Sequence, residues 1–172
     1  GDTTREIHRI YKDVFSKIET AVSRKIPAGE TPVGERSTEI LPALRMMLSG
    51  KEHRTLKVRN NKLIEHFTGS DTAFQIISKP FTPDIIVYCK SNYIYTAAEG
   101  STEEVLEDLR ARIRSFEAAF GHEPKVILVK GIGLIGVGDH AAGADTILDV
   151  YEDLMKIGWL SESFGGPNPM TP

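Results

Sequence analysis

The first 22 residues of the chain alternate apolar and polar positions at helical spacing. Thr3 can cap a helix, with Glu6 three positions later as in a capping box. The apolar residues that follow recur every three or four positions and would share one helix face: Ile7, Ile10, Tyr11, Val14, Phe15, Ile18 and Val22. Pro27 and Pro32 interrupt this pattern. The pattern therefore predicts an amphipathic helix followed by a loop over residues 27–34.

The next segments predict shorter elements with recognisable ends. A second helix is expected over residues 37–48, ended by Gly50. Residues 55–58 resemble a short strand. Asn60 can cap a brief helix that runs through Phe67 and is closed by the glycine at position 69.

Between residues 81 and 95 the sequence becomes rich in β-branched and aromatic residues. Residues 85–88 and 93–95 predict two strands, joined by a polar turn at residues 90–92. This segment therefore predicts a β-hairpin.

The last 70 residues alternate helical and strand patterns. Ser101 can cap a long helix that ends at Gly121. The apolar run at 125–129 predicts a buried strand, and residues 134–137 predict another after a glycine turn. Asp139 is expected to cap a final helix. This order favours one α/β domain over residues 1–172, with a mixed β-sheet covered by helices.

Composition narrows the classes of function. With 172 residues, 40% of them hydrophobic, the chain can bury a core of its own. A net charge of −3 argues against nucleic-acid binding. Neither a membrane-length apolar run nor a signal-peptide pattern occurs, so no membrane association is expected. Cys89 is the only cysteine, which suits a reducing compartment and predicts a cytoplasmic location.

One glycine-rich segment allows two interpretations. Residues 131–136 match the G-x-G-x-x-G pattern of dinucleotide-binding turns, in which a helix begins within the motif. Here the residues after the second glycine are apolar and suit a strand. A glycine-rich hairpin is therefore the favoured interpretation, and a Rossmann-type nucleotide-binding domain is an alternative.

Two motifs resemble a known family. After the apolar strand comes G-x-G-x-x-x-x-G, here Gly131, Gly133 and Gly138. Upstream, residues 82–84 begin a T-P-D-x-x-x-x-x-K segment that ends at Lys90. Over residues 41–172 the chain resembles the carboxyl-terminal half of class II aldolase/adducin proteins. The closest match is the aldolase portion of bifunctional rhamnulose-1-phosphate aldolase/alcohol dehydrogenases.

The resemblance implies a three-layer fold, distinct from a standard Rossmann fold, and a lyase of deoxy-sugar metabolism that acts on rhamnulose or fuculose phosphates. Such aldolases use zinc or another divalent metal held by histidines. This sequence contains no H-x-H; Ile132 occupies the histidine position of the family's His-Gly pair, and Ile85 follows Asp84. We therefore expect the chain to be part of a longer protein and to hold no metal itself. The metal ligands would come from outside the chain, and the chain alone would be inactive. A non-catalytic, adducin-like binding or assembly module is the first alternative.

The predicted substrate-binding residues come from these two motifs: Asp84, Lys90, Lys130, Gly131 and Gly133. Lys130 beside a glycine turn could hold a phosphate, because exposed backbone N–H groups favour anions. The simpler alternatives are that Asp84 orders a turn, that Lys90 is solvated, and that the glycines serve only backbone conformation. No catalytic residue is assigned. The expected partners are a sugar phosphate and, by the resemblance, further copies of the chain in a homo-oligomer.

Overall fold

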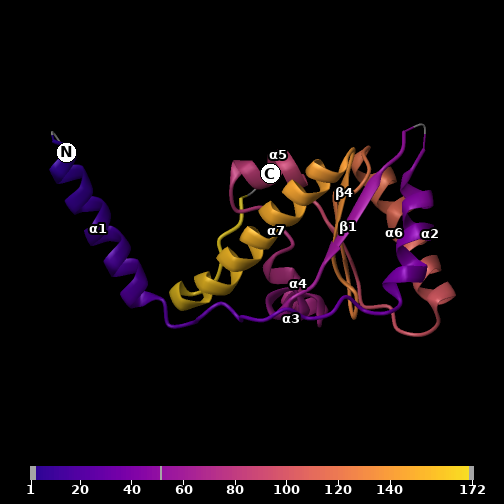
Figure 1. Cartoon of the computed structure of the whole chain (residues 1–172), viewed down its shortest axis with the longest axis horizontal. Helices are drawn as coiled ribbons and strands as arrows, with labels where there is room; N and C mark the ends of the chain where they lie inside the picture. Colours follow the sequence, from indigo (N-terminus) through magenta and orange to yellow (C-terminus); the bar gives the residue numbers. More distant parts are fainter. Residues whose placement is uncertain (1–2, 51, 171–172) are drawn as a thin grey trace.

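Figure 1 shows a computed structural model that describes residues 3–50 and 52–170. The remaining positions of the predicted 1–172 domain, including both chain ends, lie outside the described residues. The elements follow in chain order: α1 (Thr4–Ala21), α2 (Ser37–Leu48), β1 (Thr55–Arg59), α3 (Lys62–Thr68), α4 (Asp71–Ile76), α5 (Pro83–Cys89), β2 (Ile94–Thr96), α6 (Thr102–Phe120), β3 (Val126–Val129), β4 (Gly133–Gly138), α7 (Ala141–Ser161) and the 3₁₀ turn η1 (Glu162–Phe164).

The four strands form one mixed sheet in the order β1-β4-β3-β2. β4 pairs antiparallel with both β1 and β3, whereas β2 pairs parallel with β3. The parallel connection from β2 to β3 passes through α6, as crossovers between parallel strands require. The prediction of a mixed sheet in an α/β chain is therefore confirmed.

Helices cover both faces of the sheet (Figure 1). Along β3, Val126 and Leu128 pack with α3, α4, α5 and α7, while Ile127 and Val129 pack with α2 and α6. This alternation follows from the two-residue period of a strand. A strand buried on both faces reads as a continuous apolar run, which is the pattern seen at 125–129.

Local capping chemistry starts helices α6 and α1 at the positions that the sequence predicts. In α6, the Ser101 side chain accepts from the Glu104 backbone N–H and the Glu104 carboxylate accepts from the Ser101 N–H, which completes a capping box. The helix ends at Gly121 in the left-handed conformation (φ 71°). Thr3 caps α1 by accepting from the Glu6 N–H.

The predicted β-hairpin at 85–95 is wrong. Residues 83–89 form helix α5, and β2 pairs with β3 rather than with its own upstream segment. Thr82 adopts the extended conformation of a helix cap and Pro83 occupies the first turn, where its missing N–H carries no penalty. Ile85 and Cys89 then face the core at helical i,i+4 spacing. A short apolar run is compatible with either element, and here the upstream Thr-Pro-Asp start favours the helix.

Two helix caps differ from the predicted ones by one residue, and one helix of the structure was not predicted. Asn61, not Asn60, caps α3 by accepting from the Ile64 N–H. His140, not Asp139, caps α7, because its Nδ1 accepts from the Gly143 N–H. Helix α4 was not predicted. Among the described helices, none has the length and apolar character needed to cross a bilayer.

Candidate functional site at the hairpin end of the sheet

The sheet has two chemically different ends. At one, here called the hairpin end, β1 and β3 finish and β4 begins, because Arg59 pairs with Leu134 and Val129 pairs with Gly133. At the other, here called the ionic end, β1 and β3 begin and β4 finishes. Three of the predicted site residues, Lys130, Gly131 and Gly133, lie at the hairpin end.

The backbone conformation at the hairpin end requires glycine at two positions. Gly131 and Gly133 have φ values of 75° and 131°, a region that L-residues rarely adopt. A Cβ on Gly133 would also overlap the carbonyl oxygen of Arg59, and a Cβ on Gly34 would overlap that of Gly131. The loop before α2 and the end of β1 therefore press directly against the turn. The prediction of a glycine-rich hairpin is confirmed: positive φ accounts for Gly131, and positive φ together with close packing accounts for Gly133.

A cleft of about 340 Å³ opens beside this turn. Its walls come from the loop before α2, the end of β1, helix α3 and the hairpin, through Thr31, Pro32, Asn60, Glu65, Thr68, Gly69, Lys130, Gly131, Ile132 and Gly133. This volume is in the range of small-molecule sites.

Asn60 lines the cleft, and its side chain carries an unused hydrogen-bond acceptor. Its side-chain Nδ2 donates to the Pro32 carbonyl oxygen at 3.0 Å, which fixes the orientation of the amide. Its Oδ1 is buried and has no hydrogen-bond partner among the described residues. Because buried polar atoms are nearly always paired in folded proteins, an unpaired one at a cleft marks a position for a donor from a ligand or water.

Lys130 is the one cationic residue among the described residues that line the cleft. Its Nζ donates to the Glu99 carboxylate at 2.5 Å. This hydrogen bond raises the pKa of Lys130 and lowers that of Glu99. Both side chains are substantially exposed, and ion pairs of this kind contribute little to stability because water screens them. A phosphate can therefore compete with Glu99 for the ammonium group.

Glu65 provides acceptor oxygens on the α3 side of the cleft. Its carboxylate accepts from Lys62 at 2.8 Å and from the Thr31 hydroxyl at 3.4 Å. The Lys62 hydrogen bond lowers the pKa of Glu65, so this group is ionised at neutral pH. The cleft thus combines one cation with two oxygen acceptors, which suits a ligand that carries both an anionic group and hydroxyl donors.

The other two predicted site residues belong to a different region. Asp84 and Lys90 lie on α5 and at its end, both exposed. Helix α5 packs on α7, and its Val87 and Tyr88 share a hollow with Lys125 and Asp139 at the ionic end. Asp84 occupies the first turn of α5, where its negative charge interacts favourably with the positive end of the helix dipole. The structure therefore separates the predicted residues into two groups.

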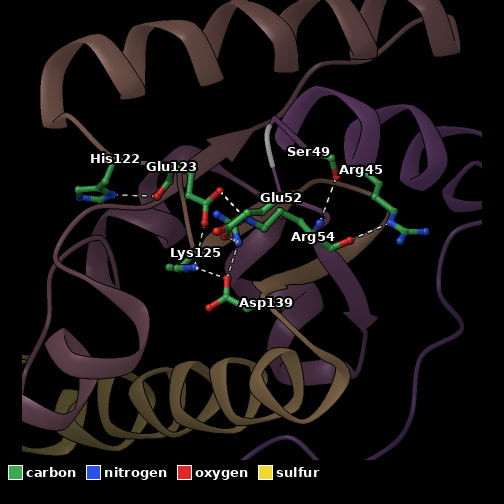
Figure 2. Close-up of polar contacts among 8 residues, drawn as sticks. All are labelled: Arg45, Ser49, Glu52, Arg54, His122, Glu123, Lys125 and Asp139. Atoms are coloured by element: carbon green, nitrogen blue, oxygen red, sulfur yellow. Dashed lines mark hydrogen bonds and ion pairs between the residues drawn. The ribbon is translucent and has the colours of Figure 1, made fainter.

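The ionic end holds a dense network that the sequence did not predict (Figure 2). Arg54 donates through Nε to Glu123 at 2.7 Å and through Nη1 to Asp139 at 2.6 Å. Lys125 donates to the second oxygen of Glu123 at 2.9 Å. The Glu123 hydrogen bond is the main cause that raises the pKa of Arg54. The network joins three separate parts of the sequence, around residues 52–54, 123–125 and 139, and only the folded sheet brings these parts together.

This network is interpreted as a structural clamp. The side chains of Arg54, Glu123 and Lys125 are only 17–19% exposed, and each charge faces an opposite charge. The clamp joins the start of β1, the start of β3 and the turn before α7, and Arg45 extends it to α2 by donating to the Arg54 carbonyl oxygen at 2.8 Å (Figure 2). Charges already matched in this way leave little attraction for a ligand.

The described residues do not suit a histidine-bound metal. Among them, no group of three or more His, Cys, Asp or Glu side chains lies close enough to hold an ion. His122 contacts the Glu123 carbonyl oxygen, and His140 caps α7. His66 lies edge-on to Trp159 with ring centroids 4.9 Å apart. None of these three histidines therefore belongs to a metal-binding cluster within the described chain.

The dinucleotide interpretation of Gly131–Gly136 needs a strand-to-helix turn. In the structure the motif joins β3 to β4, and α7 begins only at Ala141. Gly136 and Gly138 instead allow α7 to approach β4, because a Cβ at either position would press on Ala144. The helix N-terminus that would receive a pyrophosphate is thus missing from the motif.

Comparison with known proteins found no matching family model and no curated protein with significant similarity. The resemblance to class II aldolases therefore stays a prediction. The function of the chain has to be inferred from the hairpin-end cleft itself.

Proposed function

We propose that this chain is the substrate-binding portion of a class II aldolase-like protein that acts on a deoxy-ketose phosphate, of the rhamnulose or fuculose 1-phosphate type. The observation that carries the proposal is the composition of the hairpin-end cleft. Lys130 and Asn60, whose Oδ1 has no partner in the described chain, line this cleft beside the same glycine turn.

Each part of such a ligand has a matching group. The phosphate dianion replaces Glu99 as the partner of Lys130, which makes a charge-assisted contact. The sugar hydroxyls donate to Asn60 Oδ1 and to the Glu65 carboxylate. A free anion such as phosphate lacks the second set of contacts, so the whole ketose phosphate should bind more tightly than phosphate alone.

The proposal gives the chain a positioning role in the reaction. A divalent metal would supply Lewis-acid chemistry to a class II aldolase reaction. Its ligands are proposed to come from residues outside this chain. Lys130, Asn60 and Glu65 then hold the phosphate and hydroxyl groups, which orients the bond to be cleaved.

Calorimetric titration with rhamnulose 1-phosphate, rhamnulose and inorganic phosphate tests this assignment. The ketose phosphate should bind most tightly. Lys130→Met should weaken it at least tenfold, because it removes the only cation that lines the cleft among the described residues. Glu99→Gln should tighten binding, because it removes the competing carboxylate.

Lys90→Met is the matched control. It removes the same charge from a predicted site residue at the end of α5, away from the hairpin end, and should leave the affinity unchanged. Equal losses for both lysine variants would contradict the site. Aldol cleavage of the same substrate by the native protein that contains this chain, abolished by a chelator, would support the reaction class.

An adducin-like assembly module is the second candidate. It is favoured by α1, whose apolar side chains are exposed along the whole helix. If the chain binds no ketose phosphate tightly but associates stably through α1, this candidate is favoured over the first.

A further inference from the structure

Helix α1 presents an apolar face that no other part of the described chain covers. It projects from the body of the molecule (Figure 1), and none of its side chains is buried. Six apolar residues are each 45–62% exposed: Ile7, Ile10, Tyr11, Val14, Phe15 and Ile18. Most helical stability in proteins comes from packing of such a face, so an 18-residue helix without packing is marginal in water.

The residues that follow α1 hold its end in place. Ser23 bonds to Ser163, with its backbone N–H donating at 3.2 Å. The guanidinium of Arg24 lies 3.7 Å from the ring centre of Trp159, and the Trp159 Nε1 donates to the Lys25 carbonyl oxygen at 2.9 Å. The chain is therefore attached to η1 and to the end of α7 from two residues after α1. This attachment favours a partner from outside over a return of α1 to its own body.

The apolar positions are symmetric about the middle of the helix. Their spacing is the same read in either direction, so in an antiparallel pair of α1 helices Ile7 faces Ile18, Ile10 faces Phe15, and Tyr11 faces Val14. A two-fold interface requires such self-complementarity, because the same patch meets itself. Positions 7, 11, 14 and 18 also follow the four-three spacing of a coiled-coil seam.

Charge also favours the antiparallel arrangement. The first half of α1 carries three basic residues and one acidic residue, while the second half carries two acidic residues and one basic residue. Antiparallel pairing places unlike halves side by side and also opposes the two helix dipoles. A membrane surface suits this helix less, because lipid-binding helices carry a predominantly basic polar face.

We infer that α1 pairs antiparallel with α1 of a second copy of this chain. The exposed apolar face is on the order of 500 Å² per helix, since aromatic side chains alone bury about 150–250 Å² each. Two copies would thus bury roughly 1,000 Å², the lower limit for a specific interface. An interface of this small size favours a weak, reversible dimer, with greater helix content in the paired state.

Sedimentation of the full chain between about 1 and 200 µM tests the inference. The wild type should change from monomer to dimer over this range, with circular dichroism showing more helix at high concentration. Val14→Glu places a charge at the centre of the seam and should keep the chain monomeric. Ser16→Glu adds the same charge to the polar face of the helix and should still dimerise.

Disulfide trapping tests the orientation. When Ile7→Cys and Ile18→Cys chains are mixed and oxidised, the cross-linked species should be mainly mixed dimers; Cys89 is buried and does not compete. Homodisulfides at position 7 would overturn the antiparallel pairing. A wild type that is monomeric at 200 µM, an oligomer that Val14→Glu leaves intact, or α1-dependent binding to phosphatidylserine vesicles without dimerisation would overturn the inference itself.

Discussion

The two ends of the sheet differ in how completely their polar groups are paired. At the ionic end, Arg54 and Lys125 both donate to Glu123, and Asp139 closes the network. At the hairpin end, the Oδ1 of Asn60 is buried without a partner in the described chain, and Lys130 holds only an exposed carboxylate.

This difference separates a structural cluster from a candidate site. Matched charges with little exposure leave no bonding capacity for a ligand, and removing one partner leaves the other charge unpaired. A sparse cleft with an unused acceptor and a cation that can exchange partners has that capacity. The number of charged residues is therefore a poorer guide to binding than the number of unsatisfied groups.

The largest effect is expected from Gly133→Ala at the hairpin end. The substitution combines an unfavourable φ of 131° with overlap between the new Cβ and the Arg59 carbonyl oxygen. It should lower the free energy of unfolding by about 4 kcal/mol, as measured by urea denaturation. Gly131→Ala is the control: its φ is 75°, but nothing lies within 4 Å of the position its methyl group would take, so about 1–2 kcal/mol is expected. Equal losses would show that close packing does not shape this turn.

Breaking the ionic end should have the next largest effect. Glu123→Gln leaves Arg54 and Lys125 without their shared carboxylate in a poorly exposed position. The free energy of unfolding should fall by about 3 kcal/mol, while affinity for a ketose phosphate stays the same. Glu52→Gln removes an Arg54 partner that is 76% exposed and should cost less than about 0.5 kcal/mol. A loss of ligand affinity in the first variant would contradict the assignment of binding to the opposite end.

Alkaline pH should weaken the core beneath α5 and α7. Burial raises the pKa of the Cys89 thiol from 9.0 to about 12 and also raises the pKa values of Tyr93 and Tyr151. The folded state therefore favours the protonated thiol, whose contribution is complete below pH 9 and declines as the pH rises toward 12. At pH 10.5 the Cys89 contribution to the free energy of unfolding should have fallen by about 2 kcal/mol. Cys89→Ala should show a shallower decline between pH 9 and 10.5 in the same denaturation series; an identical decline would contradict this cause.

The smallest effect on stability is expected from Asn60→Ala. The variant loses the hydrogen bond to Pro32 but also removes the buried, unpaired Oδ1. These opposing changes should leave the free energy of unfolding within about 1 kcal/mol of the wild type. Ketose-phosphate affinity should nevertheless fall several-fold, whereas affinity for inorganic phosphate should stay constant. A parallel loss for both ligands would assign Asn60 to the phosphate rather than to the sugar hydroxyls.

Sequence patterns predicted those parts of the fold that local chemistry decides. Ser101 and Glu104 form their capping box within four residues, and the strand at 126–129 is apolar throughout because both faces are covered. The glycine hairpin was also predictable, since apolar residues follow Gly133 directly. Helix α5 was missed because four consecutive apolar residues satisfy a strand or a buried helix equally well.

The candidate site was predictable only in part. Lys130, Gly131 and Gly133 are adjacent in sequence, so a motif could identify them. Asn60 contributes because β1 ends beside β4, and its unpaired oxygen depends on how Pro32 orients the amide. The ionic network likewise depends on contacts between residues up to 85 positions apart, as between Arg54 and Asp139. No local pattern in the sequence encodes either arrangement.

The most direct test of the central claim is an amide NMR titration of the wild-type chain with rhamnulose 1-phosphate. We predict that chemical shifts change at the hairpin end, at Asn60, Lys130, Gly131 and Gly133, and stay constant at Arg54, Lys125 and Asp139. The Lys130→Met variant should lose these changes. Shift changes concentrated at the ionic end, or hairpin-end changes that persist without Lys130, would contradict the assignment of the binding site to the hairpin-end cleft.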